Sequence, residues 1–355
     1  MPVNRVMRGL LWSALLLVVS FSSSVSQAAP SMVSGREPDY ASLHPEGSPY
    51  LRSVVSNGGG RQTPATDQKP LTVGAVPVPS VGAEAAIVVE YPSGRILYQK
   101  AAHTRLAMAS TTKITTAILA LEYGKLDDVV TVTSQDMIWG TKMGLQPGER
   151  QTLRNLLYGL LIPSGNDAAM TIARYVGSKT MPVRPGEGPV NAFIRLMNKR
   201  VVQFGLKESH YANPHGLDAA GHYSSAYDLA SLTWYAMHFD TFNQIVRQPS
   251  YQAPGHTLQN LNKMLARYPG AQGVKTGYTG DAGLCLVAAA TRDGRQVISV
   301  VLNAPHWIDD STAMLDYGFA KLSGAPPANA VLLARAGEKL SIVRTLAGSL
   351  PGKKK

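Results

Sequence analysis

The sequence has few cysteines, few charges and no long hydrophobic run, and each lack excludes a class of protein. Cys285 is the only cysteine in 355 residues, so the chain can form neither an intrachain disulfide nor a zinc site built from cysteines. Charged residues make up 16% of the chain and hydrophobic residues 45%, which excludes a wholly disordered protein. Because leucines flank Cys285, we expect it to be a small apolar residue of the core.

The N-terminal apolar stretch, residues 10–21, is too short for an ordinary transmembrane helix, which needs about 20 residues. Arg5 and Arg8 precede it, and Ser26-Gln27-Ala28 offers small residues where a signal peptidase cuts. We therefore expect residues 1–28 to be a signal peptide that exports the protein to the cell envelope or out of the cell. An uncleaved membrane anchor is the alternative.

Positive charge exceeds negative charge, with 34 Lys and Arg against 23 Asp and Glu and a net charge of +11. Such an excess suits contact with anionic polymers, lipid headgroups or nucleic acid. The sequence shows no basic helix interleaved with aromatic residues, so we expect no nucleic-acid partner. The three terminal lysines allow weak contact with an anionic membrane or wall polymer, although a solvated tail is favoured.

Composition and periodicity divide the rest of the chain into three parts. Residues 29–80 are rich in Pro, Ser and Gly and are interpreted as a lead-in or linker. Residues 81–323 carry periodic patterns and are predicted to be one domain, and residues 324–355 a short C-terminal tail. Strand patterns in two pairs predict two hairpins, the second with Asp-Gly at its tip. The four strands are 85–90, 95–100, 284–291 and 296–302.

Helical patterns occupy the middle of the domain, and a last helix is predicted near its end. The predicted helices are 114–121, 153–161, 190–201, 229–239 and 309–322. Strands at both ends with helices between them indicate an α+β fold, in which one antiparallel sheet is covered by helices.

A serine and a lysine three positions apart, Ser110 and Lys113, stand at the start of the predicted helix 114–121. They share a helix face and lie within reach of each other. The free N–H groups at the helix start favour negative charge near Ser110. The apolar residues that follow predict that Lys113 is buried, which disfavours its charged form and makes it a base near neutral pH. A capped helix with a surface lysine would show the same pattern.

Ser164-Gly165-Asn166 lies directly before a predicted helical segment. It places a hydroxyl and an amide on one rim, where they can relay a proton and hold a substrate carbonyl. An ordinary helix cap is the alternative interpretation.

Lys275-Thr276-Gly277 precedes the predicted strand 284–291. A lysine and a threonine on a strand edge can bind a carboxylate, and the glycine lets a substrate backbone approach as an added strand. A glycine-rich turn is the alternative.

In this order, the three motifs resemble the signature shared by penicillin-binding proteins and serine β-lactamases. Their neighbouring residues, with Asn-Pro-His-Gly-Leu-Asp at 213–218, are similar to the low-molecular-weight D-alanyl-D-alanine carboxypeptidases over about residues 83–322. The resemblance implies a penicillin-binding-protein-like and β-lactamase-like sheet with a mainly helical subdomain, and it implies no cofactor. The expected substrates are peptidoglycan stem peptides ending in D-Ala-D-Ala, with β-lactam antibiotics as covalent inhibitors.

The resemblance also implies a role for each motif residue. Ser110 would be the nucleophile that forms the acyl-enzyme, Lys113 the general base, and Ser164 the proton relay to the leaving D-alanine. The backbone N–H groups of Ser110 and Tyr278 would form the oxyanion hole. The substrate-binding residues would be Asn166, Lys275, Thr276 and Gly277. Three nearby histidines suggest a metal site, but no His-Glu-x-x-His is present and the resemblance places His215 and His222 in a structural loop, so no metal is expected.

The chain departs from its relatives in one position that bears on the site. Several family members place an arginine that assists carboxylate recognition before the last helix, where this chain has Pro-His-Trp-Ile-Asp at 305–309. Three alternative functions remain: a DD-endopeptidase, a β-lactamase, and a non-catalytic wall-binding protein. The glutamate segment of class A β-lactamases is not found between Asn166 and Lys275, and the intact motifs argue against a non-catalytic role.

Overall fold

The computed structural model describes residues 76–180, 182 and 184–323. The predicted signal peptide (1–28), residues 29–75 of the predicted lead-in, and the predicted tail (324–355) lie outside the described residues. Within the described ranges, no helix has both the length and the apolar composition that a membrane crossing requires.

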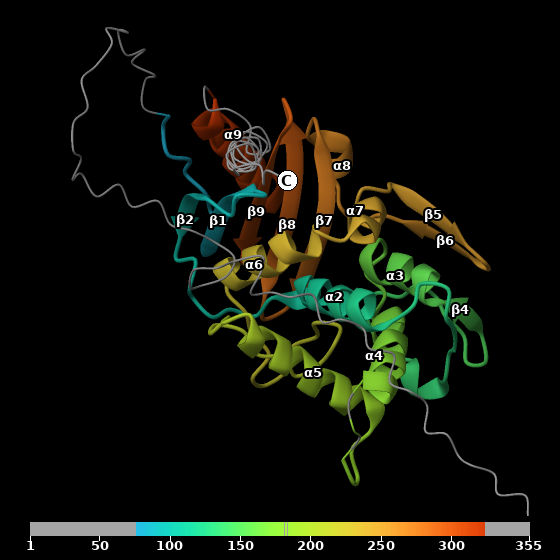
Figure 1. Ribbon diagram of the computed structural model, residues 1–355. Helices are drawn as coiled ribbons and strands as arrows, with labels where there is room; N and C mark the ends of the chain where they lie inside the picture. The colour runs from blue at the N-terminus through green and yellow to red at the C-terminus, as the bar shows by residue number, and fades with distance from the viewer. Residues whose placement is uncertain (1–75, 181, 183, 324–355) are drawn as a thin grey trace, which may run out of the picture. The chain divides into compact units, whose positions relative to one another are not determined.

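Five antiparallel strands form the main sheet, in the order β2-β1-β9-β8-β7 (Figure 1). The strands are β1 (Ala85–Tyr91), β2 (Ile96–Lys100), β7 (Ala271–Thr279), β8 (Gly283–Arg292) and β9 (Arg295–Leu302). β1 pairs with β9 from Ala85 opposite Leu302 to Tyr91 opposite Gln296. The first and last parts of the domain therefore meet in one sheet, and the predicted α+β fold is confirmed. β7, which carries the Lys-Thr-Gly motif, is an edge strand.

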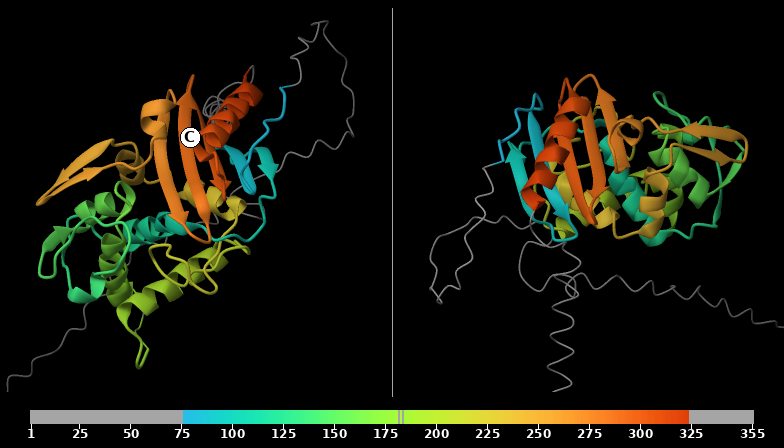
Figure 2. Two further views of the ribbon diagram at one scale, coloured as in Figure 1. Left: turned by 180° about the vertical axis from the view of Figure 1, so that it is seen from behind. Right: turned by 90° about the horizontal axis from the view of Figure 1, so that it is seen from above.

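Both faces of this sheet are buried, and β1 shows why. Ala85, Ile87 and Val89 belong to a large core shared with the helices of the middle of the chain. Ala86 and Val88 point to the opposite face because successive side chains of a strand alternate. They belong to a second core that includes apolar residues of α9 (Trp307–Leu322). Figure 2 shows α9 on one face of the sheet and α6 on the other.

The segment between β2 and β7 is mainly helical. Its α-helices are α2 (Lys113–Tyr123), α3 (Leu153–Leu161), α4 (Asn166–Thr180), α5 (Pro189–Gln203), α6 (Ala226–Ala236), α7 (Asp240–Val246) and α8 (Met264–Arg267). Every residue of α2 from Lys113 to Ala120 is buried, so α2 is the central helix and the motif lysine enters the core with it. Short 3₁₀ helices also occur, η1 (Ala109–Thr112) before α2 and η2 (Ser134–Asp136).

Two small hairpins were not predicted, β3 (Val129–Thr131) with β4 (Arg150–Thr152) and β5 (Ser250–Ala253) with β6 (His256–Gln259). Strands of three or four residues are too short to show a clear alternation. The predicted β8–β9 hairpin is confirmed, with Asp293 and Gly294 both at positive φ, as a type I′ turn requires.

Two predicted helix boundaries are wrong. The predicted helix 229–239 begins at Ala226, where the Ser225 side chain accepts the Asp228 N–H, and it ends at Ala236. Phe239 is extended and a separate helix, α7, follows it. α9 begins at Trp307 rather than at residue 309, because Trp307 and Ile308 pack against the second core. A local cap, the Ser225 side chain, therefore sets the start of α6, and packing on the second core sets the start of α9.

Candidate active site

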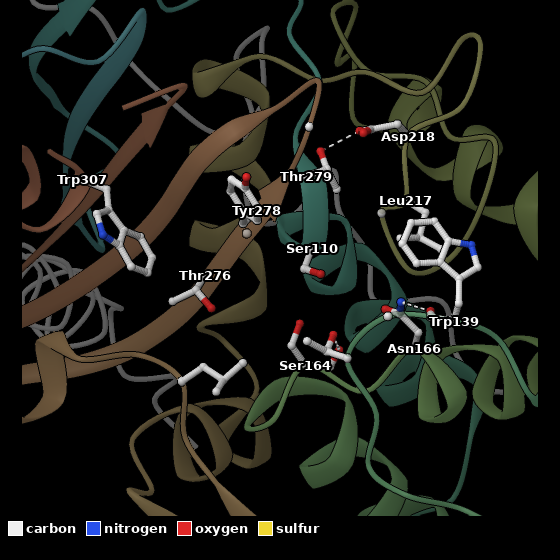
Figure 3. Close-up of a pocket in the computed structure, with 16 residues that line it drawn as sticks. Ser110, Trp139, Ser164, Asn166, Leu217, Asp218, Thr276, Tyr278, Thr279 and Trp307 are labelled. Carbon is white, nitrogen blue, oxygen red and sulfur yellow. Dashed lines mark hydrogen bonds between the residues drawn. The ribbon is translucent and has the colours of Figure 1, made fainter. Parts of the chain in front are cut away.

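A cleft of about 440 Å³ lies between β7, the start of α2 and the turn before α4 (Figure 3). All three motifs contribute to its lining, which contains Ser110, Ser164, Asn166, Thr276, Gly277 and Tyr278. The two motif lysines lie behind this surface, with Lys113 0% and Lys275 1% exposed. The structure thus brings all eight predicted site residues to one place.

Lys113 is held at the first turn of α2 with its side-chain nitrogen against the nucleophile candidate. Its Nζ lies 2.8 Å from Ser110 Oγ and 2.8 Å from Asn166 Oδ1, and it donates to the carbonyl of His215 at 2.6 Å. Burial, followed by repulsion from Lys275, holds the pKa of Lys113 well below its ordinary value, and the Asp167 carboxylate opposes this only in part. A neutral amine at this distance can accept the Ser110 hydroxyl proton.

Lys275 is the second buried lysine, on β7. Burial lowers its pKa to about 7, so near neutral pH it exchanges readily between its charged and neutral forms. Its Nζ donates to the carbonyl of Thr276 at 3.0 Å. When protonated it places a positive charge 3.0 Å from the carbonyl of Thr276, a residue that lines the cleft. This arrangement suits a ligand that carries a carboxylate.

The turn between α3 and α4 presents Ser164 and Asn166. Ser164 has a positive φ of 65°, and its carbonyl accepts the Thr141 hydroxyl at 2.7 Å. Asn166 donates its side-chain amide to the carbonyl of Trp139 at 2.9 Å, which leaves its oxygen directed at Lys113. The loop that carries Trp139 and Thr141 therefore fixes which way the Asn166 amide faces.

Asp167 anchors the loop that faces the cleft, and the sequence interpretation missed this role. Its carboxylate accepts the N–H groups of Met143, Gly144, Leu145 and its own helix neighbour Ala168 at 2.8–3.0 Å. An acid at a helix start was visible in the sequence. Its loop partners lie more than twenty residues upstream and carried no local signal.

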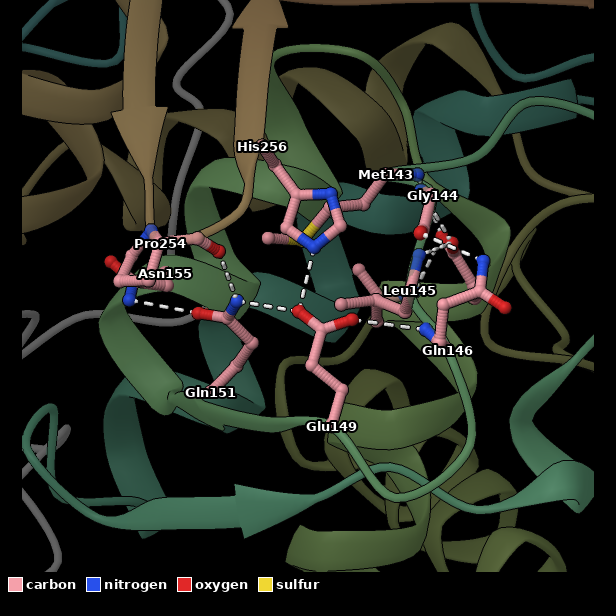
Figure 4. A network of polar contacts seen from close by, with 11 residues as sticks. Met143, Gly144, Leu145, Gln146, Glu149, Gln151, Asn155, Pro254 and His256 are labelled. Atoms are coloured by element: carbon pink, nitrogen blue, oxygen red, sulfur yellow. Dashed lines mark hydrogen bonds and ion pairs between the residues drawn. The ribbon is translucent and has the colours of Figure 1, made fainter.

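A second network ties the same loop to the β5–β6 hairpin (Figure 4). Glu149 Oε1 accepts from His256 at 2.6 Å and from Gln151 at 2.6 Å, and Gln151 also donates to the carbonyl of Pro254 at 2.8 Å. Burial opposes the charge of Glu149, but the hydrogen bonds from Gln151 and His256 together lower its pKa. The hairpin and the loop are thus braced against each other beside the cleft.

His222 braces η1 from the loop before α6, and His215 lies in the same loop. His222 Nδ1 accepts the Ala212 N–H at 3.0 Å, while its Nε2 lies 2.8 Å from the Thr112 hydroxyl, which donates to the carbonyl of Ala109. Its Nε2 must therefore carry the proton, so the ring is neutral. Burial lowers the pKa of His215 to about 3 and that of His222 to about 4. No set of three metal-ligating side chains converges among the described residues.

The strand β7 packs directly on η1. A Cβ placed on Gly277 would lie 3.0 Å from the Ala109 Cβ and 3.1 Å from the Ser110 nitrogen. Glycine allows this close approach, since a side chain would require the strand or the helix to shift by a few tenths of an ångström. Ser110 and Tyr278, whose N–H groups were predicted to form the oxyanion hole, both line the cleft.

The sequence interpretation also missed the apolar side chains around the cleft. These are Trp139, Leu217, Leu261 and Trp307. Trp307 lies at the start of α9, in the stretch where the expected arginine is absent. Asp218 is the one charged side chain in the lining of this cleft.

Comparison with known proteins finds a matching family and relatives that share one description. Residues 72–306 match the family described as D-alanyl-D-alanine carboxypeptidase. The chain is 35% identical over 258 residues to the D-alanyl-D-alanine carboxypeptidase DacF of Bacillus subtilis, covering 69% of this chain and 64% of the relative. It is 35% identical over 288 residues to a D-alanyl-D-alanine carboxypeptidase from a Streptomyces strain, covering 76% and 95%.

Solved structures agree with these relatives. The DD-transpeptidase of a Streptomyces strain is 35% identical, with a TM-score of 0.63 and coverage of 68% of this chain and 98% of that one. A penicillin-binding protein homologue from Mycobacterium tuberculosis is 31% identical, with a TM-score of 0.64 and coverage of 72% and 98%.

The fold and the site together define a serine hydrolase of the penicillin-binding type, in which a buried lysine lies against a serine at a helix start. The chain belongs to the D-alanyl-D-alanine carboxypeptidase family, as the three motifs predicted. It spans about two thirds of the length of the Bacillus relative and nearly all of the Streptomyces relative.

Proposed function

We propose that this protein removes the terminal D-alanine from peptidoglycan stem peptides through an acyl-enzyme on Ser110. The observation that carries the proposal is the 2.8 Å contact between Ser110 Oγ and the buried Lys113 Nζ. Because the pKa of Lys113 is held low, its neutral amine takes the hydroxyl proton as Ser110 attacks the D-Ala–D-Ala carbonyl.

The remaining steps use the other groups of the cleft. The oxyanion of the tetrahedral intermediate is stabilised by the backbone N–H groups of Ser110 and Tyr278, and each such donor is worth about 3 kcal/mol. Ser164 passes a proton to the departing D-alanine, so the C–N bond breaks with a neutral amine leaving. Thr276 and the Lys275 charge hold the terminal carboxylate. Water then hydrolyses the ester and regenerates Ser110.

Penicillin follows the first half of the same path, because its strained amide acylates Ser110. The leaving nitrogen stays attached to the acyl group, so no amine product departs from the cleft. This supports β-lactam antibiotics as covalent inhibitors. The first 28 residues support export to the envelope, where the substrate occurs. N-terminal sequencing of protein recovered outside the cytoplasm tests export: a start at Ala29 supports cleavage of the signal peptide.

Transfer of the acyl group to an amine is the second candidate function. The structure from Streptomyces strain K15 is a DD-transpeptidase by name, although the relative from the same strain is named a carboxypeptidase. Both reactions share the acyl-enzyme, so they differ only in whether water or an amine resolves it. Adding glycine as acceptor and analysing the products separates them.

The decisive experiment labels the purified protein with a fluorescent penicillin beside a Ser110→Ala variant, and measures D-alanine release from a pentapeptide ending in D-Ala-D-Ala. Stable labelling and D-alanine release, both lost in the variant, support the proposal. Rapid loss of the label with destruction of the antibiotic indicates a β-lactamase. A folded wild-type protein that neither labels nor releases D-alanine overturns the proposal.

A further inference from the structure

A small cavity of about 280 Å³ adjoins the segment that carries Leu261. Leu261 lines the cleft with Ser110, whereas its neighbours Asn260 and Asn262 line this cavity. The other lining residues are Pro249, Lys263, Leu265, Ala266 and Arg267. The cavity therefore lies against α8, beside β7 (Figure 1). Its volume is near the lower limit for ligand pockets, which suits a small polar group rather than an extended chain.

This cavity presents positive charge that no acidic side chain neutralises. Lys263 and Arg267 are four positions apart at α8, so their side chains lie about one helical turn from each other. Both residues are exposed. Within the described ranges neither forms an ion pair, and the lining of the cavity contains no Asp or Glu. The charge of the two side chains is therefore available to an anionic ligand.

An amide N–H group at the same cavity lacks an acceptor. Asn262 is only 4% exposed, and its side-chain oxygen accepts the Met264 N–H at 3.0 Å. This bond fixes which end of the amide is the nitrogen. The nitrogen itself is buried and has no hydrogen-bond partner among the described residues. An unpaired buried donor is destabilising, so the arrangement favours a ligand that brings an acceptor.

We propose that this cavity binds a phosphate group through the charges of Lys263 and Arg267 and the amide of Asn262. A phosphate suits the lining better than a carboxylate does, because a monoester carries about two negative charges and has three acceptor oxygens. The guanidinium can bind two of these oxygens together, while the ammonium adds a point charge. A phosphate held here keeps an anionic polymer or lipid surface beside the cleft, and this binding does not depend on the proposed function.

Heteronuclear NMR of the nitrogen-labelled protein tests the site with inorganic phosphate and with glycerol 3-phosphate. The titrations are made at pH 7 and constant ionic strength, since salt screens exposed charges. The side-chain amide signal of Asn262, assigned by its absence in Asn262→Ser, is expected to shift saturably because the group gains an acceptor. Acetate and chloride are expected to bind at least about tenfold more weakly, because they offer less charge and fewer acceptor oxygens.

Two substitutions test the charges. Lys263→Gln and Arg267→Gln should each weaken phosphate binding about fivefold, as expected for charged contacts that are partly exposed to water. The double variant should lose the saturable shift. Since both side chains are exposed, these variants should keep the thermal unfolding of the wild type. Lys125→Gln is the matched control, because Lys125 is exposed and lies outside the lining of the cavity, and it should bind phosphate as the wild type does.

A second measurement identifies the source of the phosphate. Co-sedimentation with vesicles of phosphatidylglycerol and phosphatidylcholine is compared between the wild type and the double variant. Vesicle binding that the double variant loses supports the site and identifies a lipid headgroup. Vesicle binding that is absent or equal in the two proteins, together with glycerol 3-phosphate binding by the wild type alone, supports the site and identifies the phosphate of a water-soluble polymer.

Folded wild-type protein whose Asn262 signal shows no saturable shift with either phosphate overturns the site. A shift that acetate or chloride reproduces at equal concentration does so too, and so does one that the double variant keeps. Failure of the proposed function is a different result, since it is measured by penicillin labelling and D-alanine release at Ser110.

Discussion

At the scale of single residues, the proposed chemistry depends on one buried amine. Lys113 is fully buried and is repelled by Lys275, and both effects make it far easier to deprotonate than a lysine in water. Three acceptors hold its nitrogen in place. Its burial was predictable from the apolar residues that follow it. Its contacts with Asn166 and with the His215 carbonyl were not, because they join residues 53 and 102 positions away.

Replacing the base tests this directly. In Lys113→Arg a long basic side chain is kept, but a guanidinium does not give up its proton and so cannot act as a base. We expect the second-order rate of acylation by penicillin to fall by about 10³-fold, within the range of general-base contributions. The low-pH limb of the wild-type rate profile, where Lys113 becomes protonated, should also disappear.

The measurement is the rate of fluorescent-penicillin labelling per folded protein between pH 5 and 9. Lys142→Arg is the matched control, since Lys142 is exposed on the loop beside the cleft and its replacement should leave the rate unchanged. A Lys113→Arg rate within threefold of wild type contradicts the role of Lys113 as base.

At the scale of secondary-structure elements, the cleft exists because an edge strand packs on the start of a helix. β7 is at the edge of the sheet, so its outer side is available to a substrate, and the lack of a side chain at Gly277 lets it approach η1. The Lys-Thr-Gly motif indicated a strand edge in the sequence. Its partner η1 lies some 160 residues earlier, and only the paired sheet brings the two together.

Two glycines of this region provide a matched comparison. A Cβ on Gly277 would lie 3.0–3.1 Å from Ala109 and Ser110, whereas a Cβ on Gly280 would meet no atom within 4 Å. Gly277→Ala should therefore move β7 away from η1 and displace the oxyanion donors, slowing acylation by about 10- to 100-fold, because small misplacements of this kind are costly.

Gly280→Ala should label with penicillin at the wild-type rate. Labelling rates of both variants, with thermal unfolding as a check on folding, decide the matter. Equal rates in the two variants would show that the close approach of β7 to η1 does not control the chemistry.

At the scale of the whole molecule, the buried ionisable groups couple stability to pH. The folded-state pKa values of His215 and His222 are about 3 and about 4, below the ordinary value of 6.5. As the pH falls below 6.5, the unfolded chain takes up these protons while the folded protein does not. The free energy of unfolding therefore decreases with falling pH, by about 1.4 kcal/mol per pH unit for each histidine. Lys275 acts in a separate pH range, from about 7 up to its ordinary pKa of 10.5. There the free energy of unfolding increases with pH, because the unfolded chain still binds a proton that the folded protein has lost.

A single substitution isolates one of these protons. His222→Gln keeps a donor for the Thr112 hydroxyl but cannot bind the proton. We expect the variant to be less stable than wild type at pH 7, and to lose stability more slowly between pH 6 and pH 4.5. Urea unfolding followed by tryptophan fluorescence at several pH values measures how the free energy of unfolding changes with pH in the wild-type protein and in the variant. Parallel slopes would mean that His222 is not held neutral in the folded protein.

The sequence by itself indicated the family, most of the elements of the main sheet and its helices, and the residues that we propose carry the chemistry. Apolar alternation and helical stripes specify strands and helices locally, and the order of the three motifs is specific enough to indicate the family. The start of α6 is set by the local Ser225 cap, which the apolar pattern does not show. The start of α9 depends on packing against the second core, and the strands of the two small hairpins are too short to show a pattern.

Only the tertiary structure decided how the parts meet. It joined β1 to β9, buried Lys113 against the His215 carbonyl, and placed Asp167 on a loop from an earlier part of the chain. It also placed Trp139 opposite Trp307 across Ser110 (Figure 3). Contacts of this kind join residues that are far apart in the sequence and form only when a long loop closes. A local sequence pattern does not show which distant residue will pack against a given side chain.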